Sequence, residues 1–224
     1  MLNQNIATAP RSQEAVFATN KVLRNTYTLL SMTLIFSAMT AAIAMMTNAA
    51  PVSIWIMLPV FIGGPFLIEK LKNGVGGLIA TFAFTGIMGY ILGPILSMYL
   101  ALPNGSQIVT MAFGLTGVLF LGLSGYALTT RKDFSFMGGF IMVGSLVLIV
   151  AIIANIFLAI PAFSLAISAA VVMLVSAGIL WKTSMMVNGG ETNYITMTVA
   201  LYTDIYVLLL HLLNLLQFFM GGDD

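Results

Sequence analysis

The sequence predicts an all-α integral membrane protein in which a bundle of seven transmembrane helices makes up almost the whole chain. Of the 224 residues, 60% are hydrophobic and only 7% are charged, and the mean hydropathy is +1.06. Soluble domains carry about a quarter of their residues as charges. The charges here also cluster in short groups, and the uncharged stretches between them have the length of about 20 residues that crosses a hydrocarbon core.

Other classes of protein fit these observations poorly. A transmembrane β-barrel has strands of about 10 residues with alternating polarity, whereas runs such as 141–160 are continuously apolar. The net charge is +1 and there is no long basic run, so the electrostatic footprint of a nucleic-acid-binding protein is missing. The absence of cysteine excludes disulfides, thiolate metal sites and a cysteine nucleophile.

The chain divides into a tail, a bundle and a short C-terminal end. Residues 1–24 are polar and lack an apolar centre, which predicts a flexible cytoplasmic tail rather than a signal peptide. Residues 25–220 form the transmembrane domain, and residues 221–224 a short periplasmic C-terminus. Charges, prolines or glycines bound the seven apolar runs of this domain, which are 26–47, 52–68, 77–100, 107–129, 135–158, 162–188 and 194–219.

The basic residues predict the orientation of the bundle. All eight fall in the tail, in alternate connections or near the end of the sixth helix: Arg11, Lys21, Arg24, Lys70, Lys72, Arg131, Lys132 and Lys182. The connections near 48–51, 101–106 and 159–161 contain none. Because positive charge stays on the cytoplasmic side, the N-terminus is expected inside and the C-terminus outside. In a topology with one helix fewer, the basic residues that follow the missing helix would lie on the periplasmic side.

Asp204 is an acidic residue well inside a predicted helix. If the helix starts near Tyr194, Asp204 lies about 15 Å along its axis, near the middle of the bilayer. A carboxylate there costs roughly 2.5–3.5 kcal/mol on insertion scales, and such residues usually face the bundle interior and mark an ion or proton path. The alternative is a structural ion pair or hydrogen bond that holds helices six and seven together.

Two more polar residues belong to this candidate site. Lys182 lies about two turns inside the sixth helix, where it either pairs with Asp204 or extends to the headgroups. If the pair forms, protonation of Asp204 would leave a buried ammonium unpaired and loosen the two helices. His211 follows Asp204 by two turns on the same face, which gives the seventh helix a polar stripe. It either lines a hydrated path or anchors helices, and one His with one Asp makes no metal site.

The segment 122-GLSG-125 is similar to the GxSG serine motif of rhomboid intramembrane proteases. Ser124 is expected about 8 Å from the cytoplasmic end of its helix and His211 about 25 Å from the cytoplasmic end of the seventh, so a catalytic dyad cannot form. We therefore expect no enzymatic activity and no cofactor. The small residues of this helix, Gly114, Gly117, Gly122, Ser124 and Gly125, are interpreted as sites of close helix packing.

Three segments give the chain its resemblance to a known family. They are 82-FAFTGIMGYILGPIL-96 with Gly89, Gly93 and Pro94, 126-YALTTRKDFSFMGGF-140 with Arg131, Lys132 and Asp133, and 189-GGETNYI-195 with Gly189, Gly190, Glu191 and Asn193. With them the sequence resembles the Bax inhibitor family, also called the transmembrane Bax inhibitor motif family, over nearly the whole chain after the tail. The last two segments are similar to its bacterial inner-membrane branch, which includes a modulator of the membrane-anchored AAA+ protease FtsH.

The resemblance implies a bundle with a central seventh helix and a non-enzymatic inner-membrane protein that binds and modulates FtsH. The tail 1–24 would supply the unstructured end that a processive protease engages. Members of the family are also described as pH-sensitive calcium leaks gated by two aspartates. Asp204 stands at the second of these positions, but Lys182 stands at the first, and an ammonium repels a divalent ion. A leak of calcium, other cations or protons around Asp204 is the alternative function.

Overall fold

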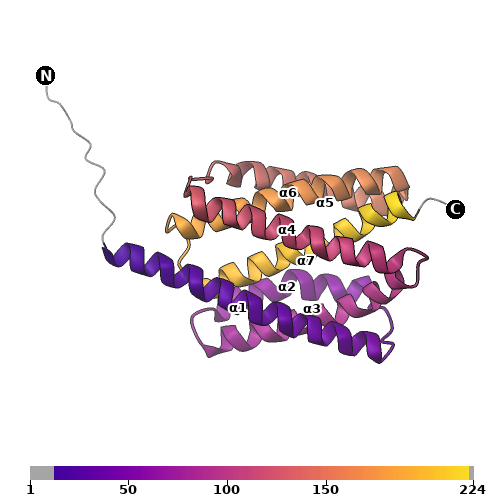
Figure 1. The fold of residues 1–224 in the computed structure, drawn as a ribbon, viewed down its shortest axis with the longest axis horizontal. Coiled ribbons are helices and arrows are strands. Elements are labelled where there is room, and N and C mark those ends of the chain that lie inside the picture. The colour runs from indigo at the N-terminus through magenta and orange to yellow at the C-terminus, as the bar shows by residue number, and fades with distance from the viewer. Residues whose placement is uncertain (1–12, 222–224) are drawn as a thin grey trace, which may run out of the picture.

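The computed structural model describes residues 13–221, and the regular secondary structure in this range is helical (Figure 1). The seven helices are α1 (Gln13–Met46), α2 (Ile54–Leu71), α3 (Val75–Leu100), α4 (Gly105–Thr130), α5 (Met137–Leu158), α6 (Pro161–Val187) and α7 (Tyr194–Met220). Each is long and apolar enough to cross a membrane. The predicted fold class is therefore confirmed.

The start of α1 differs from the sequence prediction. Residues 13–24 were expected to belong to a flexible tail, but they form the first turns of α1. The physical reason is that no proline or glycine interrupts the chain between Gln13 and Met46. Helix α1 has 34 residues, more than the about 20 that cross a hydrocarbon core, and Figure 1 shows its first turns projecting past the other helices. The remaining residues of the expected tail, 1–12, and residues 222–224 lie outside the described residues.

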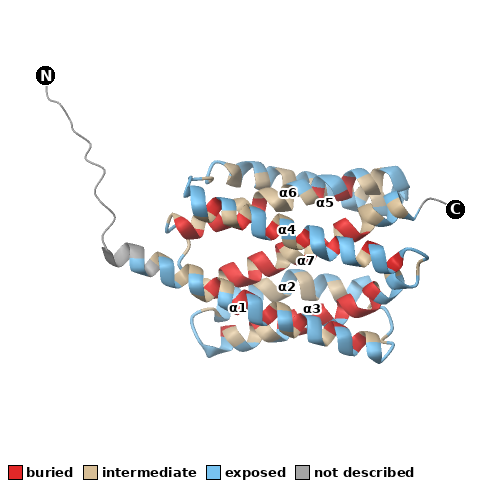
Figure 2. Cartoon of the chain, in the orientation of Figure 1, coloured by how far each residue is buried: buried red, intermediate tan, exposed pale blue. Residues whose placement is uncertain are grey.

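Helix α7 lies at the centre of the bundle. It contacts α1, α2, α3, α4 and α6, and Figure 2 shows buried residues following one another along it. In Figure 1, α1, α2 and α3 lie on one side of α7 and α4, α5 and α6 on the other. Among the described residues, α5 contacts only α6 and has no buried residue, and α2 contacts only α3 and α7. These two helices are peripheral, and the expected central position of the seventh helix is confirmed.

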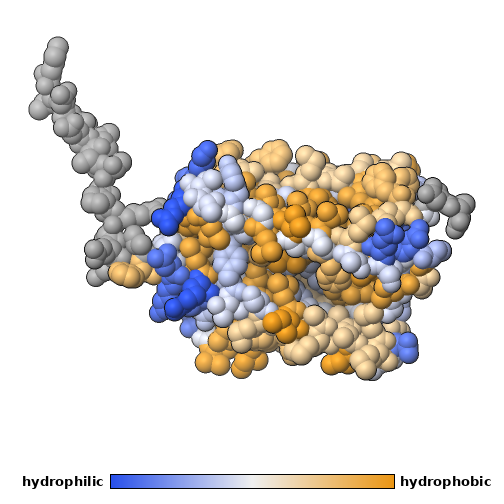
Figure 3. Space-filling view, in the orientation of Figure 1, coloured by the Kyte–Doolittle hydropathy of each residue, from blue (hydrophilic) through white to orange (hydrophobic). Residues whose placement is uncertain are grey.

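On the face that Figure 3 shows, the surface is mostly apolar between hydrophilic residues at the two ends. We call the end that holds the α2–α3, α4–α5 and α6–α7 connections the basic end, because Lys70, Lys72, Arg131 and Lys132 lie at or beside these connections. The opposite end holds the α1–α2, α3–α4 and α5–α6 connections. This distribution of polarity is that of an integral membrane protein, whose helices present apolar side chains to the hydrocarbon.

Glycines bring α1 and α3 into the most extensive helix interface of the bundle. A Cβ atom on Gly89 would fall on the backbone carbonyl oxygen of Ser37, and one on Gly93 would lie 2.6 Å from the Ala44 Cβ. Small residues four positions apart let transmembrane helices approach closely, and this contact drives association where the hydrophobic effect cannot. Gly89 and Gly93 of the family segment are therefore packing residues.

The glycines of α4 do not have the packing role expected from the sequence. Gly114, Gly117, Gly122 and Gly125 have nothing within 4 Å of a Cβ position, so a methyl group on any of them would meet open space, although Gly117 and Gly125 are partly buried. The expectation considered which residue types occur in this helix but not which face carries them. It was wrong for these four residues and correct for Ser124, which is buried against α6.

The two groups of glycines predict opposite effects of the same substitution. Gly89→Ala should lower the free energy of unfolding by about 1–3 kcal/mol, because the new methyl group overpacks a backbone that cannot yield. Gly114→Ala should leave it unchanged or raise it by up to about 1 kcal/mol through helix propensity. Unfolding by SDS in mixed micelles, followed by circular dichroism, measures both, and equal effects of the two substitutions would contradict the assignment.

Candidate functional site: an ion pair between α6 and α7

A buried ion pair joins α6 to α7. The Lys182 Nζ donates hydrogen bonds to both carboxylate oxygens of Asp204, each at 2.7 Å. Asp204 is buried, and 20% of the Lys182 side chain is exposed. Of the two arrangements that the sequence allowed for Lys182, the structure shows pairing rather than extension to the headgroups. The reason is that a carboxylate at this depth needs a counter-charge more than an ammonium near a helix end needs water.

The positions of the two residues along their helices allow this pairing. Lys182 lies five residues before Val187, where α6 ends, and Asp204 lies ten residues after Tyr194, where α7 begins. These offsets correspond to depths of about 8 and 15 Å, and the flexible lysine stem covers the difference. Gly178 lies beside the pair, since a Cβ there would be 3.6 Å from the Lys182 Nζ. A side chain longer than alanine at this position would compete with the ion pair for space.

The ion pair borders a cavity of about 320 Å³ between α2, α6 and α7. Helices α2 and α6 do not contact each other within the described residues, which leaves this space between them. Glu69 lines its wall on α2, where the carboxylate accepts a hydrogen bond from the Thr196 hydroxyl at 2.8 Å and pairs with Lys72. The Glu69 carboxylate raises the pKa of the Lys72 ammonium above its usual value. The cavity thus brings a second carboxylate, near the basic end, into the surroundings of Asp204.

Glu69 was not identified from the sequence. The available signal was an acidic residue three positions before Lys72, at the point where the second apolar run ends. On a helix such a pair is usually a solvated surface feature of little energetic weight. Only the arrangement of α2 against α7 places this carboxylate in the wall of the cavity.

His211 lies apart from the ion pair. Its Nδ1 atom is 3.0 Å from the hydroxyl oxygen of Ser168 on α6, a partner that the sequence analysis missed. About 10 Å of helix separates His211 from Asp204, and the buried side chain of Leu208 lies between them in the sequence. The structure therefore brings Lys182 and Asp204 together and leaves His211 as a separate contact between the same two helices.

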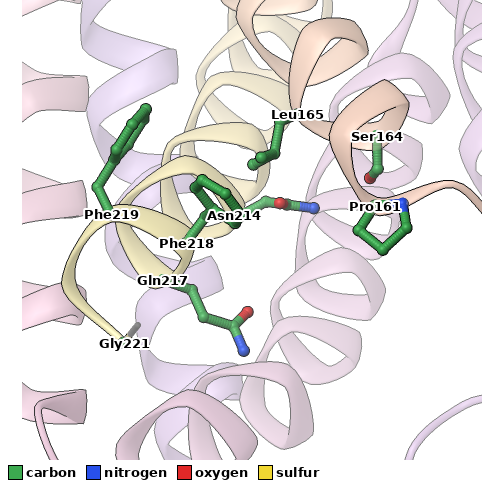
Figure 4. Close-up of a pocket in the computed structure, with 8 residues that line it drawn as sticks. All are labelled: Pro161, Ser164, Leu165, Asn214, Gln217, Phe218, Phe219 and Gly221. Atoms are coloured by element: carbon green, nitrogen blue, oxygen red, sulfur yellow. The ribbon is translucent and has the colours of Figure 1, made fainter. Parts of the chain in front are cut away.

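The polar stripe of α7 ends in a depression at the opposite end of the bundle. This depression has a volume of about 650 Å³, and Asn214 and Gln217 of α7 line it together with Pro161 and Ser164 of α6. Figure 4 shows the Asn214 side chain extending from α7 toward α6. Polar groups thus occur along α7 from one end of the bundle to the other, with an apolar interval between His211 and Asp204.

The family segment at 189–195 shapes the connection that leads into α7. Gly189 has a positive φ of 75°, and the Gly190 N–H donates to the Met185 carbonyl at 2.8 Å, which terminates α6 in a Schellman motif. The Glu191 carboxylate accepts from the next two backbone N–H groups at 2.9 and 2.8 Å. Asn193 caps α7 by accepting from the N–H groups two and three residues on, at 3.0 and 3.1 Å. These residues fold the connection that sets the register of α7.

The family segment around the α4–α5 connection has a similar structural role. Arg131 ends α4 in a left-handed conformation with φ of 51°. The Lys132 carbonyl accepts a hydrogen bond from the Ser184 hydroxyl of α6 at 2.9 Å, and the Asp133 carboxylate accepts one from the Ser135 N–H at 2.8 Å. The connection is thereby tied to α6 two residues from Lys182.

Ser124 of the GLSG segment is a packing residue. Its hydroxyl lies 3.4 Å from that of Thr183 on α6. His211, which a serine dyad would require, instead contacts Ser168. The two residues therefore have different partners at different levels of α6.

The geometry of the ion pair predicts that losing one partner is worse than losing both. Asp204→Asn leaves a buried ammonium without its counter-charge and should lower the free energy of unfolding by about 3 kcal/mol, near the lower limit for buried pairs. The double variant Lys182→Met with Asp204→Leu should recover most of this loss, because apolar groups of similar size replace both charges. Unfolding in mixed micelles gives the free energy of unfolding of the single and double variants. If the double variant loses as much stability as the two single variants together, the ion pair is contradicted.

Comparison with known proteins agrees with this architecture. A family model described as inhibitor of apoptosis-promoting Bax1 matches residues 19–221. The chain is 45% identical over 213 residues to the modulator of FtsH protease YccA of Escherichia coli, a match that covers 95% of this chain and 97% of that protein. An uncharacterized protein of Pseudomonas aeruginosa is 49% identical over 91% of each chain. An uncharacterized membrane protein of Vibrio cholerae is 44% identical over 99% of this chain and 100% of its own. The chain belongs to the Bax inhibitor family.

Proposed function

We propose that this chain is a multi-pass protein of the bacterial inner membrane that binds and modulates an FtsH-type membrane-anchored AAA+ protease. The observation that carries the proposal is the identity of 45%, over 97% of its length, to a protein named a modulator of FtsH protease. The unmatched 5% of this chain is shorter than any of its seven helices, so no whole helix falls outside the match. The chain acts as a binding partner rather than as an enzyme.

The projecting start of α1 gives this proposal a structural basis. With the basic end in the cytoplasm, as the positive-inside rule requires, the N-terminus lies on the side where the ATPase ring of an AAA+ protease works. The first turns of α1 project past the other helices of the bundle (Figure 1). On this proposal the protease engages residues 1–12, and the bundle resists extraction and so keeps the protease occupied.

Removal of the engaged segment tests the proposal. Deletion of residues 2–12 leaves α1 intact and should slow degradation by FtsH several-fold, because the protease loses the end that it pulls. The same deletion should weaken competition between this chain and a second membrane substrate. Both are measured with the variant and Escherichia coli FtsH reconstituted together in liposomes.

A second variant tests whether the protease needs the particular sequence of residues 2–12 or only an accessible N-terminal segment of that length. A variant in which a Gly/Ser segment of equal length replaces residues 2–12 should be degraded at the original rate if the protease requires only an accessible end. Degradation and competition that the deletion leaves unchanged would contradict the proposed engagement.

A proton-sensitive cation leak is the second candidate function. It is favoured by the position of the ion pair beside a cavity near the basic end, with a depression where the polar stripe ends at the other. The buried side chains of Val171 and Leu208 belong to the apolar interval between these two spaces. The Lys182 ammonium occupies the side of Asp204 where a divalent cation would bind, so such a leak would disfavour calcium.

Flux assays in liposomes test the leak directly. If this chain conducts, cation flux should change with pH, and Asp204→Asn should abolish that change. Lys182→Asp should raise calcium flux several-fold, because two carboxylates attract the ion that the ammonium repels. Calcium and proton flux indistinguishable from empty liposomes across the pH range, for the original chain and both variants, would exclude the leak.

A further inference from the structure

A groove between α1 and α4, here called the α1–α4 groove, lies on the outer surface of the bundle and does not include the ion pair. It has a volume of about 210 Å³ and is lined by residues of α1, α3, α4 and α7. Helices α1 and α4 do not contact each other within the described residues, and each packs on α3 and on the central helix. Figure 1 shows α7 between them. The groove therefore exists because two neighbouring outer helices leave a gap over α7, where Ile205 is partly exposed.

The α1–α4 groove is continuous with the surface that faces the bilayer. Ala38 and Ala42 of α1 are exposed at its rim, and Phe113 of α4 is 47% exposed. Leu92 of α3 and Leu209 of α7 are buried among its lining residues. The groove thus deepens from the lipid-facing surface toward the core, and hydrocarbon is the solvent at its mouth.

The surface of the α1–α4 groove is almost wholly apolar, and three of its four hydroxyl groups already have a hydrogen-bond partner. The Tyr202 hydroxyl donates to the Thr85 carbonyl at 3.2 Å and lies 2.6 Å from the Ser37 hydroxyl. The Thr116 hydroxyl donates to the carbonyl four residues before it at 2.7 Å. The Tyr206 hydroxyl has no hydrogen-bond partner within the described residues but is itself buried, so it offers no surface to an occupant. Buried water needs about 2–4 polar partners, and the groove exposes few polar atoms, which favours an apolar occupant.

We propose that the α1–α4 groove binds one acyl chain of a membrane phospholipid. Its volume exceeds the roughly 150 Å³ of an apolar protein cavity that stays dry and binds benzene. Its lining follows α1 from Leu34 to Met45, a length of about 16 Å that suits an extended chain rather than a compact molecule. The bilayer supplies such chains at this depth. The bound chain lies in the gap over α7 and bridges α1 and α4, which do not contact each other within the described residues.

Photolabelling with a phospholipid that carries a diazirine in its acyl chain tests this proposal in liposomes. Adducts mapped by mass spectrometry should concentrate on the groove segments of α1 and α4. Ala38→Phe fills the mouth of the groove and should lower these adducts several-fold. Ala170→Phe is the matched control, because Ala170 is exposed on α6 outside the groove, at a similar depth of about 12–14 Å from its helix end. It should leave the adducts unchanged.

Other outcomes overturn the proposal. Adducts spread over all exposed apolar residues, and unaffected by Ala38→Phe, would show only the ordinary lipid contact of any membrane protein. If Ala38→Phe does not elute as a folded species in size-exclusion chromatography, Ala42→Leu fills the same mouth with a smaller group and decides in its place. Efficient disulfide cross-linking of Ala42→Cys between two copies would identify a protein, rather than a lipid, as the occupant.

Discussion

A carboxylate cannot remain alone in hydrocarbon, and the arrangement of the bundle depends on how Asp204 meets this constraint. Lys182 provides the counter-charge from α6, and both of its contacts with the carboxylate are 2.7 Å long. The pair can form only if α6 and α7 pack side by side in a fixed register. The remaining polar groups of α7 require the same enclosure, so five helices contact α7. The most apolar helix, α5, needs no such protection and lies at the periphery with no buried residue.

Close packing stabilises the other helix interfaces of the bundle. The hydrophobic effect cannot do so, because lipid tails are as apolar as the side chains of the helices. The contrast between Gly89 and Gly114 shows what this requires. The first glycine lies where a methyl group would fall on the backbone of α1, and the second lies where a methyl group would meet nothing. Residues of the family segments in the connections act in a comparable way, since Gly189 and Asn193 end one helix and begin the next. The family segments contain residues that allow close helix packing or that shape the connections between helices.

Properties that depend on one helix alone could be predicted from the sequence. The seven apolar runs and the depth of Asp204 follow from composition and helical rise, and pairing with Lys182 was one of two stated alternatives. Properties that depend on which face meets which neighbour could not. The open space beside the α4 glycines, the place of Glu69 beside the cavity and the contact of Ser168 with His211 all depend on the relative rotation of two helices. The early start of α1 was missed for a different reason, because polar residues continue a helix as well as apolar ones when no breaker intervenes.

The α1–α3 interface determines how the bundle responds to a mechanical load. Both helices run from the basic end to the opposite end, so they are parallel. A pull on the N-terminus acts along the axis of α1 and loads this interface in shear, where all contacts share the force instead of peeling apart in turn. To slide along α3, Ser37 and Ala44 of α1 must pass out of the hollows left by Gly89 and Gly93. An unfolding motor that starts at the N-terminus therefore meets the most extensive interface of the molecule at its first helix.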